Sequence, residues 1–351
     1  MNDLCKMIGL KLMKVLFYRE RPTIFDVFFA YRLLLNRLPD ESGWEHFLKH
    51  KKQHHLSLID LLNLFWNSSE FSIKCDLLNQ SDNAPNYENT PIQEEIVELS
   101  DFSIFIDRND KMVGEAIKVN RYYEPHVTAA LKKILKTGQT FVDVGANIGY
   151  FSLLASIIVR PNGKVIALEP MVQNYSLFEK SIKLNEIKNI ELQRIAALNE
   201  NKPINMIQVK RFNSGSFHIL NDPHWNMDIY TVEGKRIDDF LYNEKIDVVK
   251  IDVEGAEGLV LKGMLETIKK SRPVIFMEFS PLSLIDISKI AGDELLGMLQ
   301  NLDYSFQDVD SFKGKFFGKT NSKLNKLLKN RKSTHLDIIV FPNSLLGTFA
   351  K

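Results

Sequence analysis

Apolar and polar residues follow a helical pattern over the first 80 residues of the chain. From Thr23 to Leu35, aromatic and aliphatic side chains recur every three or four positions, which is typical of a helix with one buried face. A polar turn at residues 37–43 and a capping-box pattern that begins at Ser57 mark the limits of further helices. The pattern therefore predicts a small helical domain over residues 1–80.

This pattern ends near residue 80. The stretch from Asn79 to Glu95 is rich in Asn, Gln, Ser, Pro and Asp, as linkers are, and we place a linker at residues 81–100. In residues 101–351, short apolar runs alternate with helical stretches, which favours a parallel α/β sheet. The candidate strands are Thr140–Val144, Lys164–Leu168, Ile190–Ile195, Asp247–Ile251, Val274–Phe279 and Leu336–Phe341.

Charge and cysteine content narrow the class of protein. The 45 Lys and Arg residues nearly balance the 44 Asp and Glu residues, so we expect no nucleic-acid partner. Two cysteines, Cys5 and Cys75, are too few for a disulfide framework, which favours a reducing, cytoplasmic location. Residues 1–21 contain lysines and no long apolar run, so we predict neither a signal peptide nor a transmembrane segment. The sequence leaves the oligomeric state open.

A glycine-containing turn lies between a predicted strand and a predicted helix. The strand ends at Val144, the turn is Gly145-Ala146-Asn147-Ile148-Gly149, and the helix spans residues 150–158. Glycine lets the backbone turn sharply and lets a ligand approach without a Cβ in the way. Glu169 follows the next strand, where its carboxylate can accept hydrogen bonds from two ribose hydroxyls. We therefore expect a nucleoside site at this turn.

The glycine spacing favours one nucleoside cofactor over another. Gly145 and Gly149 do not form the G-x-G-x-x-G spacing of dinucleotide sites. Asp143, just before the turn, would repel a pyrophosphate but suit the ammonium and sulfonium charges of S-adenosyl-L-methionine. The turn thus favours S-adenosyl-L-methionine, and a nucleotide-linked oxidoreductase is an alternative.

Acidic residues cluster after two later strands. Asp252, Glu254 and Glu257 follow one strand, and Glu278 ends the next. The carboxyl ends of parallel strands meet in one crevice, where carboxylates can position an acceptor and take its proton. Glu254 and Glu257 can instead simply favour a helix N-terminus. A divalent cation between Asp252 and Glu278 has no supporting spacing rule, and we predict no metal site.

Four segments together carry a family resemblance. They are Tyr123–Pro125, Phe141–Ser152, Leu168–Pro170 and Lys250–Glu257, the last reading Lys-Ile-Asp-Val-Glu-Gly-Ala-Glu. Over residues 101–342 the chain resembles FkbM-type methyltransferases. The resemblance implies a class I methyltransferase fold, which is a Rossmann-like seven-stranded sheet with an antiparallel last strand. It also implies S-adenosyl-L-methionine as cofactor and O-methylation, frequently of a sugar hydroxyl in glycan or natural-product biosynthesis.

The same resemblance assigns roles to single residues. It implies a cofactor set in which the turn holds the methionine part, Glu169 the ribose, and two alanines the adenine: Asp143, Gly145, Ala146, Asn147, Gly149, Glu169, Ala196 and Ala197. It places Asp252, Glu254 and Glu257 beside the transferred methyl group without fixing which one acts as base. Asn213–Ser216 falls where an acceptor-facing loop would lie, or is a surface turn.

The N-terminal region is similar to a different family. Residues 31–43 and Ser68-Ser69-Glu70-Phe71 resemble a small helical domain of unknown function. That domain accompanies surface-layer, calcium-binding repeat and glycosyltransferase proteins, so the resemblance implies a small-molecule or glycan acceptor and an association with glycosyltransferases.

Two histidines lie near the predicted acceptor loop. His218 and His224 are candidates for acid-base chemistry, and His218 joins the predicted catalytic set of Asp252, Glu254 and Glu257. Trp225 can stack on a sugar or pack in a core. Besides an active methyltransferase, a catalytically inactive binding module in a glycan-assembly complex stays open as a function.

Overall fold

The computed structural model describes residues 92–208, 213–215, 217–219, 229–312, 324, 328 and 335–345. The chain divides into two compact units, Met1–Thr90 and Pro91–Lys351, and every described residue belongs to the second. The predicted helical domain at residues 1–80 lies outside the described residues. Part of the predicted 81–100 linker is described, and it forms strand β1 (Glu94–Glu98). The second unit therefore includes residues before 101.

Seven strands form the central sheet, in the order β12-β13-β11-β10-β3-β4-β5. All neighbours from β5 to β11 pair in parallel, whereas β13 runs antiparallel to both β11 and β12. This confirms the predicted class I methyltransferase fold with its antiparallel last strand. The strands are β3 (Thr140–Val144), β4 (Lys164–Leu168), β5 (Ile190–Gln193), β10 (Val248–Ile251), β11 (Val274–Phe279), β12 (Tyr304–Asp308) and β13 (Leu336–Pro342).

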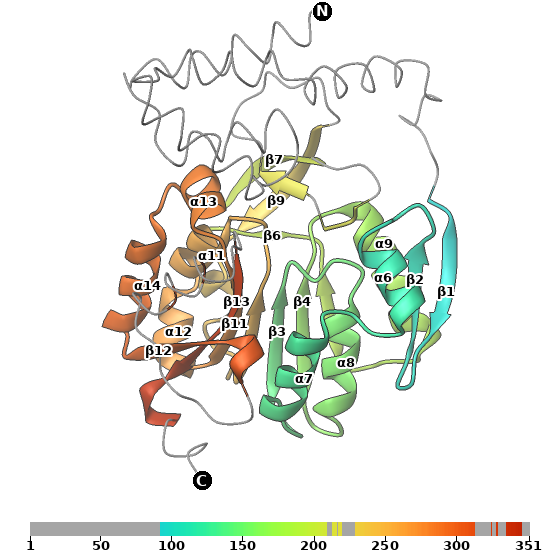
Figure 1. Cartoon of the computed structure of the whole chain (residues 1–351), viewed down its shortest axis with the longest axis horizontal. Coiled ribbons are helices and arrows are strands. Elements are labelled where there is room, and N and C mark those ends of the chain that lie inside the picture. Colours follow the sequence, from blue (N-terminus) through green and yellow to red (C-terminus); the bar gives the residue numbers. More distant parts are fainter. Residues whose placement is uncertain are drawn as a thin grey trace, which may run out of the picture. The chain divides into compact units, whose positions relative to one another are not determined.

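Alternate residues of each strand enter two different cores, because successive side chains point to opposite faces of a sheet. In β3, Phe141 packs in one core, whereas Val142 and Val144 pack in the other. Helices on both faces complete these cores (Figure 1). One face is covered by α7 (Pro125–Ile134), α8 (Tyr150–Ile158) and α9 (Val172–Leu184), and the other by α10 (Asp238–Leu241), α11 (Glu257–Gly263), α12 (Leu265–Ser271) and α14 (Gly292–Asn301).

A second, smaller sheet was not predicted from the sequence. Its strand order is β6-β9-β7-β8, and in Figure 1 its labelled strands lie above the central sheet. The predicted strand at residues 190–195 ends at Gln193, and Ala196 and Ala197 begin this second sheet. The strands are β6 (Ala196–Ala197), β7 (Lys202–Gln208), β8 (Phe217–Ile219) and β9 (Ile229–Lys235).

A β-hairpin precedes the central sheet and packs on α9. Strands β1 and β2 (Ser103–Asp107) pair antiparallel, and the hairpin leads into α6 (Val113–Asn120), as Figure 1 shows. Backbone N–H groups of β2 donate to Asn185 Oδ1 and Ser181 Oγ at 2.8 and 2.9 Å. The remaining short helices are Pro281–Ser283, Leu284–Ser288, Val309–Ser311 and Asn343–Leu345. Among the described helices, none has the length and apolar character needed to cross a bilayer.

Candidate active site

The predicted cofactor turn brings β3 against the end of β10. Gly145 has φ +80°, and a Cβ on it would lie 2.0 Å from the carbonyl oxygen of Asp252. Gly149 has φ +91° and begins α8, where a Cβ would lie 2.1 Å from the ring of Phe178. Both positions therefore require glycine, for conformation and for space.

Glu169 lies at the carboxyl end of β4, as predicted, and is 4% exposed. Its Oε2 accepts the N–H of Asn147 at 2.8 Å, and its Oε1 accepts the N–H of Met171 at 2.9 Å. Burial raises the pKa of Glu169 to about 7, although these hydrogen bonds oppose the shift. Each carboxylate oxygen keeps acceptor capacity for a further donor.

A hollow with about 610 Å³ of empty volume, part of it open to solvent, lies beside this turn. Seven of the predicted site residues line it, drawn from four separate parts of the chain: Gly145, Asn147, Glu169, Ala196, Ala197, Asp252 and Glu254. The apolar part of its wall includes Met171, Leu198, Ile204 and Met206. We call this hollow the cofactor pocket, because it combines polar groups at the turn with an apolar wall that suits a nucleoside base.

Asp143, Ala146 and Gly149 are not among the described residues that line the cofactor pocket. Asp143 is 1% exposed, and its Oδ2 accepts the hydroxyl of Ser152 at 2.6 Å. Burial raises the pKa of Asp143, whereas the ammonium group of Lys250 and the bond from Ser152 lower it. The contact of Asp143 with the methionine part of the cofactor stays a prediction, and its observed bond instead ties β3 to α8.

Lys250 is a charged site residue that was not predicted. It interrupts the apolar strand β10, its side chain is 8% exposed, and its Nζ donates to Asp252 Oδ2 at 2.7 Å. The Nζ also lies 4.8 Å from the ring centroid of Phe151. Burial disfavours the ammonium ion, but the carboxylates of Asp252, Glu124 and Asp143 outweigh it and raise the pKa of Lys250. Lys250 could have been found from the sequence, because it is a charged residue inside an otherwise apolar strand.

The three acids after β10 occupy different environments. Asp252 is partly exposed and lines the cofactor pocket, as does Glu254, whose φ is +52°. Glu257 is 1% exposed, and its Oε1 accepts the N–H groups of Val253 and Gly255 at 3.3 and 3.2 Å. Burial raises the pKa of Glu257 to about 7. The geometry of Glu257 fits the role of organising the turn.

A second hollow, with about 230 Å³ of empty volume that includes open solvent, also has Asp252 in its wall. Lys250, Glu278 and Asp337 line it together with apolar residues of β11, β13 and α7. Asp252 therefore stands in the walls of both hollows. We call this second hollow the acceptor pocket, after the role that we propose for it below.

Carboxyl groups crowd the acceptor pocket. Burial, together with the carboxylates of Asp252, Glu254 and Glu257, raises the pKa of Glu278 to about 9. Burial likewise raises the pKa of Glu124, the residue before α7, to about 7. Glu278 is thus largely protonated at neutral pH and can donate a hydrogen bond. His126 is bonded to Asp337 at 2.7 Å, which raises the pKa of the imidazole.

Part of the predicted acceptor loop lies outside the described residues. His224, Trp225 and the side chain of His218 fall there, so their roles stay predictions. Ser214 and Gly215 are described, and both line the cofactor pocket. In the part of the chain that the structure describes, no group of three or more His, Cys, Asp or Glu side chains is placed to hold a metal ion.

The strand order and the antiparallel β13, with a hollow at the glycine turn, are those of the class I methyltransferase architecture. Residues 143–306 match the family model of the Methyltransferase FkbM domain. This range holds the glycine turn, Glu169 and the acids after β10. The match and the geometry together indicate a methyltransferase domain whose cofactor is S-adenosyl-L-methionine.

Two curated proteins show more distant similarity. Methyltransferase 1 of Beauveria bassiana (strain ARSEF 2860) is 23% identical over 191 residues, which cover 49% of this chain and 75% of that protein. A protein-L-isoaspartate O-methyltransferase of Caenorhabditis elegans is 29% identical over 110 residues, covering 28% of this chain and 49% of that protein.

Two solved structures are also similar. Methyltransferase FkbM from Methylobacillus flagellatus KT has a TM-score of 0.37 at 15% identity, covering 58% of this chain and 43% of that chain. A SAM-dependent O-methyltransferase from Thermotoga maritima has a TM-score of 0.36 at 11% identity, covering 71% of this chain and 77% of that chain. The present chain thus matches less than half the length of the solved FkbM protein.

Proposed function

We propose that this protein transfers a methyl group from S-adenosyl-L-methionine to a hydroxyl oxygen of a sugar. One observation carries the proposal: Asp252 lines both the cofactor pocket and the acceptor pocket. A carboxylate at such a junction is close to where the methyl group would leave one ligand and reach the other. The FkbM match over residues 143–306 supports the methyl-transfer part of the proposal.

On the cofactor side, the proposal uses groups that line the pocket. Glu169 accepts hydrogen bonds from the two ribose hydroxyls, since carboxylate oxygens can each accept more than one donor. Ala196 and Ala197 lie against the adenine, where a small side chain leaves room for a flat ring. Gly145 and Asn147 carry the methionine part along the turn. S-adenosyl-L-methionine supplies the electrophilic methyl group.

On the acceptor side, Asp252 takes the proton. With S-adenosyl-L-methionine bound, attack of the acceptor oxygen on the methyl carbon would break the carbon–sulfur bond, leave its electron pair on sulfur, and give S-adenosylhomocysteine and a methyl ether. The hydroxyl proton passes to the Asp252 carboxylate, which Lys250 holds in place with a 2.7 Å hydrogen bond. Positioning of the two reactants contributes much of the rate.

The charges of the acceptor pocket favour a neutral, hydroxyl-rich acceptor. Asp252 and Asp337 would repel a phosphate or carboxylate but can accept hydrogen bonds from sugar hydroxyls. Glu278 can donate to an acceptor oxygen while it is protonated. A glycan setting also agrees with the N-terminal resemblance to domains that accompany glycosyltransferases.

The first experiment is calorimetric titration with S-adenosylhomocysteine, with NAD as the control ligand. Micromolar binding, about −8 kcal/mol, without a response to NAD would support the cofactor assignment. Transfer of a radiolabelled methyl group to a panel of methyl glycosides then tests the acceptor, with Asp252→Asn expected to lose at least a hundredfold in rate. Binding of NAD, or of neither ligand, would refute the proposed function and favour the oxidoreductase or the binding-module alternative.

A further inference from the structure

Asp110 lies outside the range that matches the family model, yet it contacts the wall of the cofactor pocket. It is 4% exposed and precedes α6. Its carboxylate accepts the N–H groups of Met112, Val113 and Gly114 at 2.9, 3.1 and 3.1 Å. These three bonds fix the carboxylate at the start of the helix.

A fourth bond reaches Asp110 from far along the chain. The hydroxyl of Ser214 donates to Asp110 Oδ2 at 2.6 Å, a short distance that is typical of a charge-assisted hydrogen bond. The backbone oxygen of Ser214 also accepts Asn174 Nδ2 at 3.0 Å. Ser214 is therefore held between the segment before α6 and helix α9.

These bonds place the Ser214–Gly215 segment beside the cofactor turn. Both residues line the cofactor pocket. The Cβ position of Gly215 is 3.7 Å from Asn147 Nδ2 and 3.8 Å from Val113 Cγ2. The segment thus occupies the space between the start of α6 and the glycine turn, on a side of the pocket that neither β3 nor β10 supplies.

We propose that Asp110 is a positioning residue for the cofactor: through Ser214 it holds the Ser214–Gly215 segment against the cofactor pocket and slows release of the bound nucleoside. The inference rests on the proposed function, because it takes S-adenosyl-L-methionine and its product as the ligands of that pocket. The three backbone bonds of Asp110 serve α6 and do not need Ser214. The hydrogen bond from Ser214 is the one that should affect how fast the ligand is released.

The test uses Ser214→Ala in the full chain, with S-adenosylhomocysteine as the probe. This substitution removes the hydroxyl and leaves in place the three backbone N–H groups that donate to the Asp110 carboxylate. We expect dissociation of the probe, followed by surface plasmon resonance, to become about tenfold faster, whereas association changes less than about twofold. Ser214→Thr keeps a hydroxyl and should restore most of the slow dissociation.

Ser305→Ala is the matched control. Ser305 lies in β12, away from the pocket lining, and its partly buried hydroxyl bonds to the side chain of Asn343. It should leave both rate constants unchanged, while the melting temperatures of the two alanine variants stay close to each other. Equal dissociation rates for wild type and Ser214→Ala would overturn the inference, as would an equal acceleration in Ser305→Ala. A wild-type protein that does not bind the probe would instead refute the proposed function on which the inference rests.

Discussion

Glu169 is a buried carboxyl, and its protonation state decides which hydrogen bonds it can make with a ligand. Burial raises its pKa to about 7. Ribose hydroxyls donate to the ionised form, so a protonated Glu169 must lose its proton before it can accept both of them. Cofactor binding should therefore be coupled to release of a proton from this residue.

We expect the affinity for S-adenosylhomocysteine to rise with pH between 6 and 8 and then to level off. Below the raised pKa the loss approaches about tenfold per pH unit, since one unit corresponds to about 1.4 kcal/mol. Calorimetry at pH 6, 7 and 8 measures the trend. Glu169→Gln cannot ionise and should bind more weakly and without this pH dependence. An identical profile in both proteins would assign the titration to another group.

Gly145 couples the cofactor turn to the acids after β10 by direct contact. Gly145→Ala would place a methyl group 2.0 Å from the carbonyl oxygen of Asp252, at φ +80°. We expect a loss of at least about 3 kcal/mol in unfolding free energy, from overpacking and backbone strain, together with weaker cofactor binding. Urea unfolding and calorimetry measure the two effects.

Gly138→Ala is the matched control for this prediction. Its φ is +78°, but no described atom lies within 4 Å of its Cβ position. This variant should lose only about 1 kcal/mol of unfolding free energy, from backbone strain, and keep its cofactor affinity. Similar losses in both variants would show that the contact with Asp252 contributes little.

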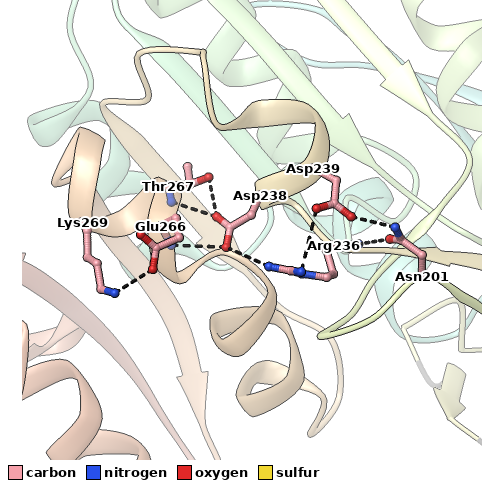
Figure 2. A network of polar contacts seen from close by, with 7 residues as sticks. All are labelled: Asn201, Arg236, Asp238, Asp239, Glu266, Thr267 and Lys269. Atoms are coloured by element: carbon pink, nitrogen blue, oxygen red, sulfur yellow. Dashed lines mark hydrogen bonds and ion pairs between the residues drawn. The ribbon is translucent and has the colours of Figure 1, made fainter.

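At the scale of elements, a side chain of α10 caps the first turn of α12. Figure 2 shows Asp238 facing the first turn of α12. Its Oδ1 accepts the N–H and the hydroxyl of Thr267, both at 2.8 Å, and its Oδ2 accepts the N–H of Glu266 at 3.2 Å. Two of the free N–H groups that every helix start leaves are thereby satisfied by a residue 27 or more positions earlier in the chain.

Removal of this cap should open α12 locally. We expect Asp238→Ala to lower the unfolding free energy by about 2 kcal/mol, because the side chain is 6% exposed and caps backbone donors. Hydrogen–deuterium exchange of peptides from residues 265–271 should accelerate. Asp239→Ala is the control: its side chain is 42% exposed and bonds to Asn201, so its cost should stay below about 0.5 kcal/mol. Equal exchange in the two variants would contradict the capping role.

At the scale of the whole molecule, acids with raised pKa values gather at the carboxyl edge of the central sheet. The pKa values of Glu124, Glu169 and Glu257 are raised to about 7 and that of Glu278 to about 9, in each case mainly by burial. A carboxyl whose pKa is raised in the folded state favours folding below its unfolded pKa. That contribution is lost as the pH rises through the folded pKa.

The free energy of unfolding should therefore fall by several kcal/mol as the pH rises from 6 to 8.5, since each pKa unit corresponds to about 1.4 kcal/mol. Deprotonation of His126 also lowers the free energy of unfolding as the pH rises, because the bond to Asp337 raises the pKa of the imidazole. Urea unfolding followed by circular dichroism at constant ionic strength measures the trend. Glu278→Gln should flatten it between pH 7.5 and 9. A free energy of unfolding that rises over the same range would show that these acids are ionised without penalty.

Local sequence determined the parts of this fold that depend on neighbouring residues. The apolar runs predicted Thr140–Val144, Lys164–Leu168 and Val274–Phe279 with the bounds that the structure has, because a buried strand needs consecutive apolar side chains. The sequence also predicted that Gly145 and Glu169 belong to one site, and both line the cofactor pocket. A turn after one strand and an acid after the next must meet at one edge of a parallel sheet.

Only the tertiary structure decided which side chains are partners. Strand β6 has two residues and exists because it pairs with β9, 38 residues later, so no local pattern indicates it. Asp110 and Ser214 are 104 residues apart and meet only because the chain packs α6 beside the Ser214–Gly215 segment. Lys250 and Asp252 are two residues apart, but burial of the lysine in β10 is what makes the nearby carboxylate its partner. Sequence thus determined the elements and the edge of the sheet that holds the site. Burial and long-range contact, which no short stretch of sequence encodes, decided the charge and the partner of each group there.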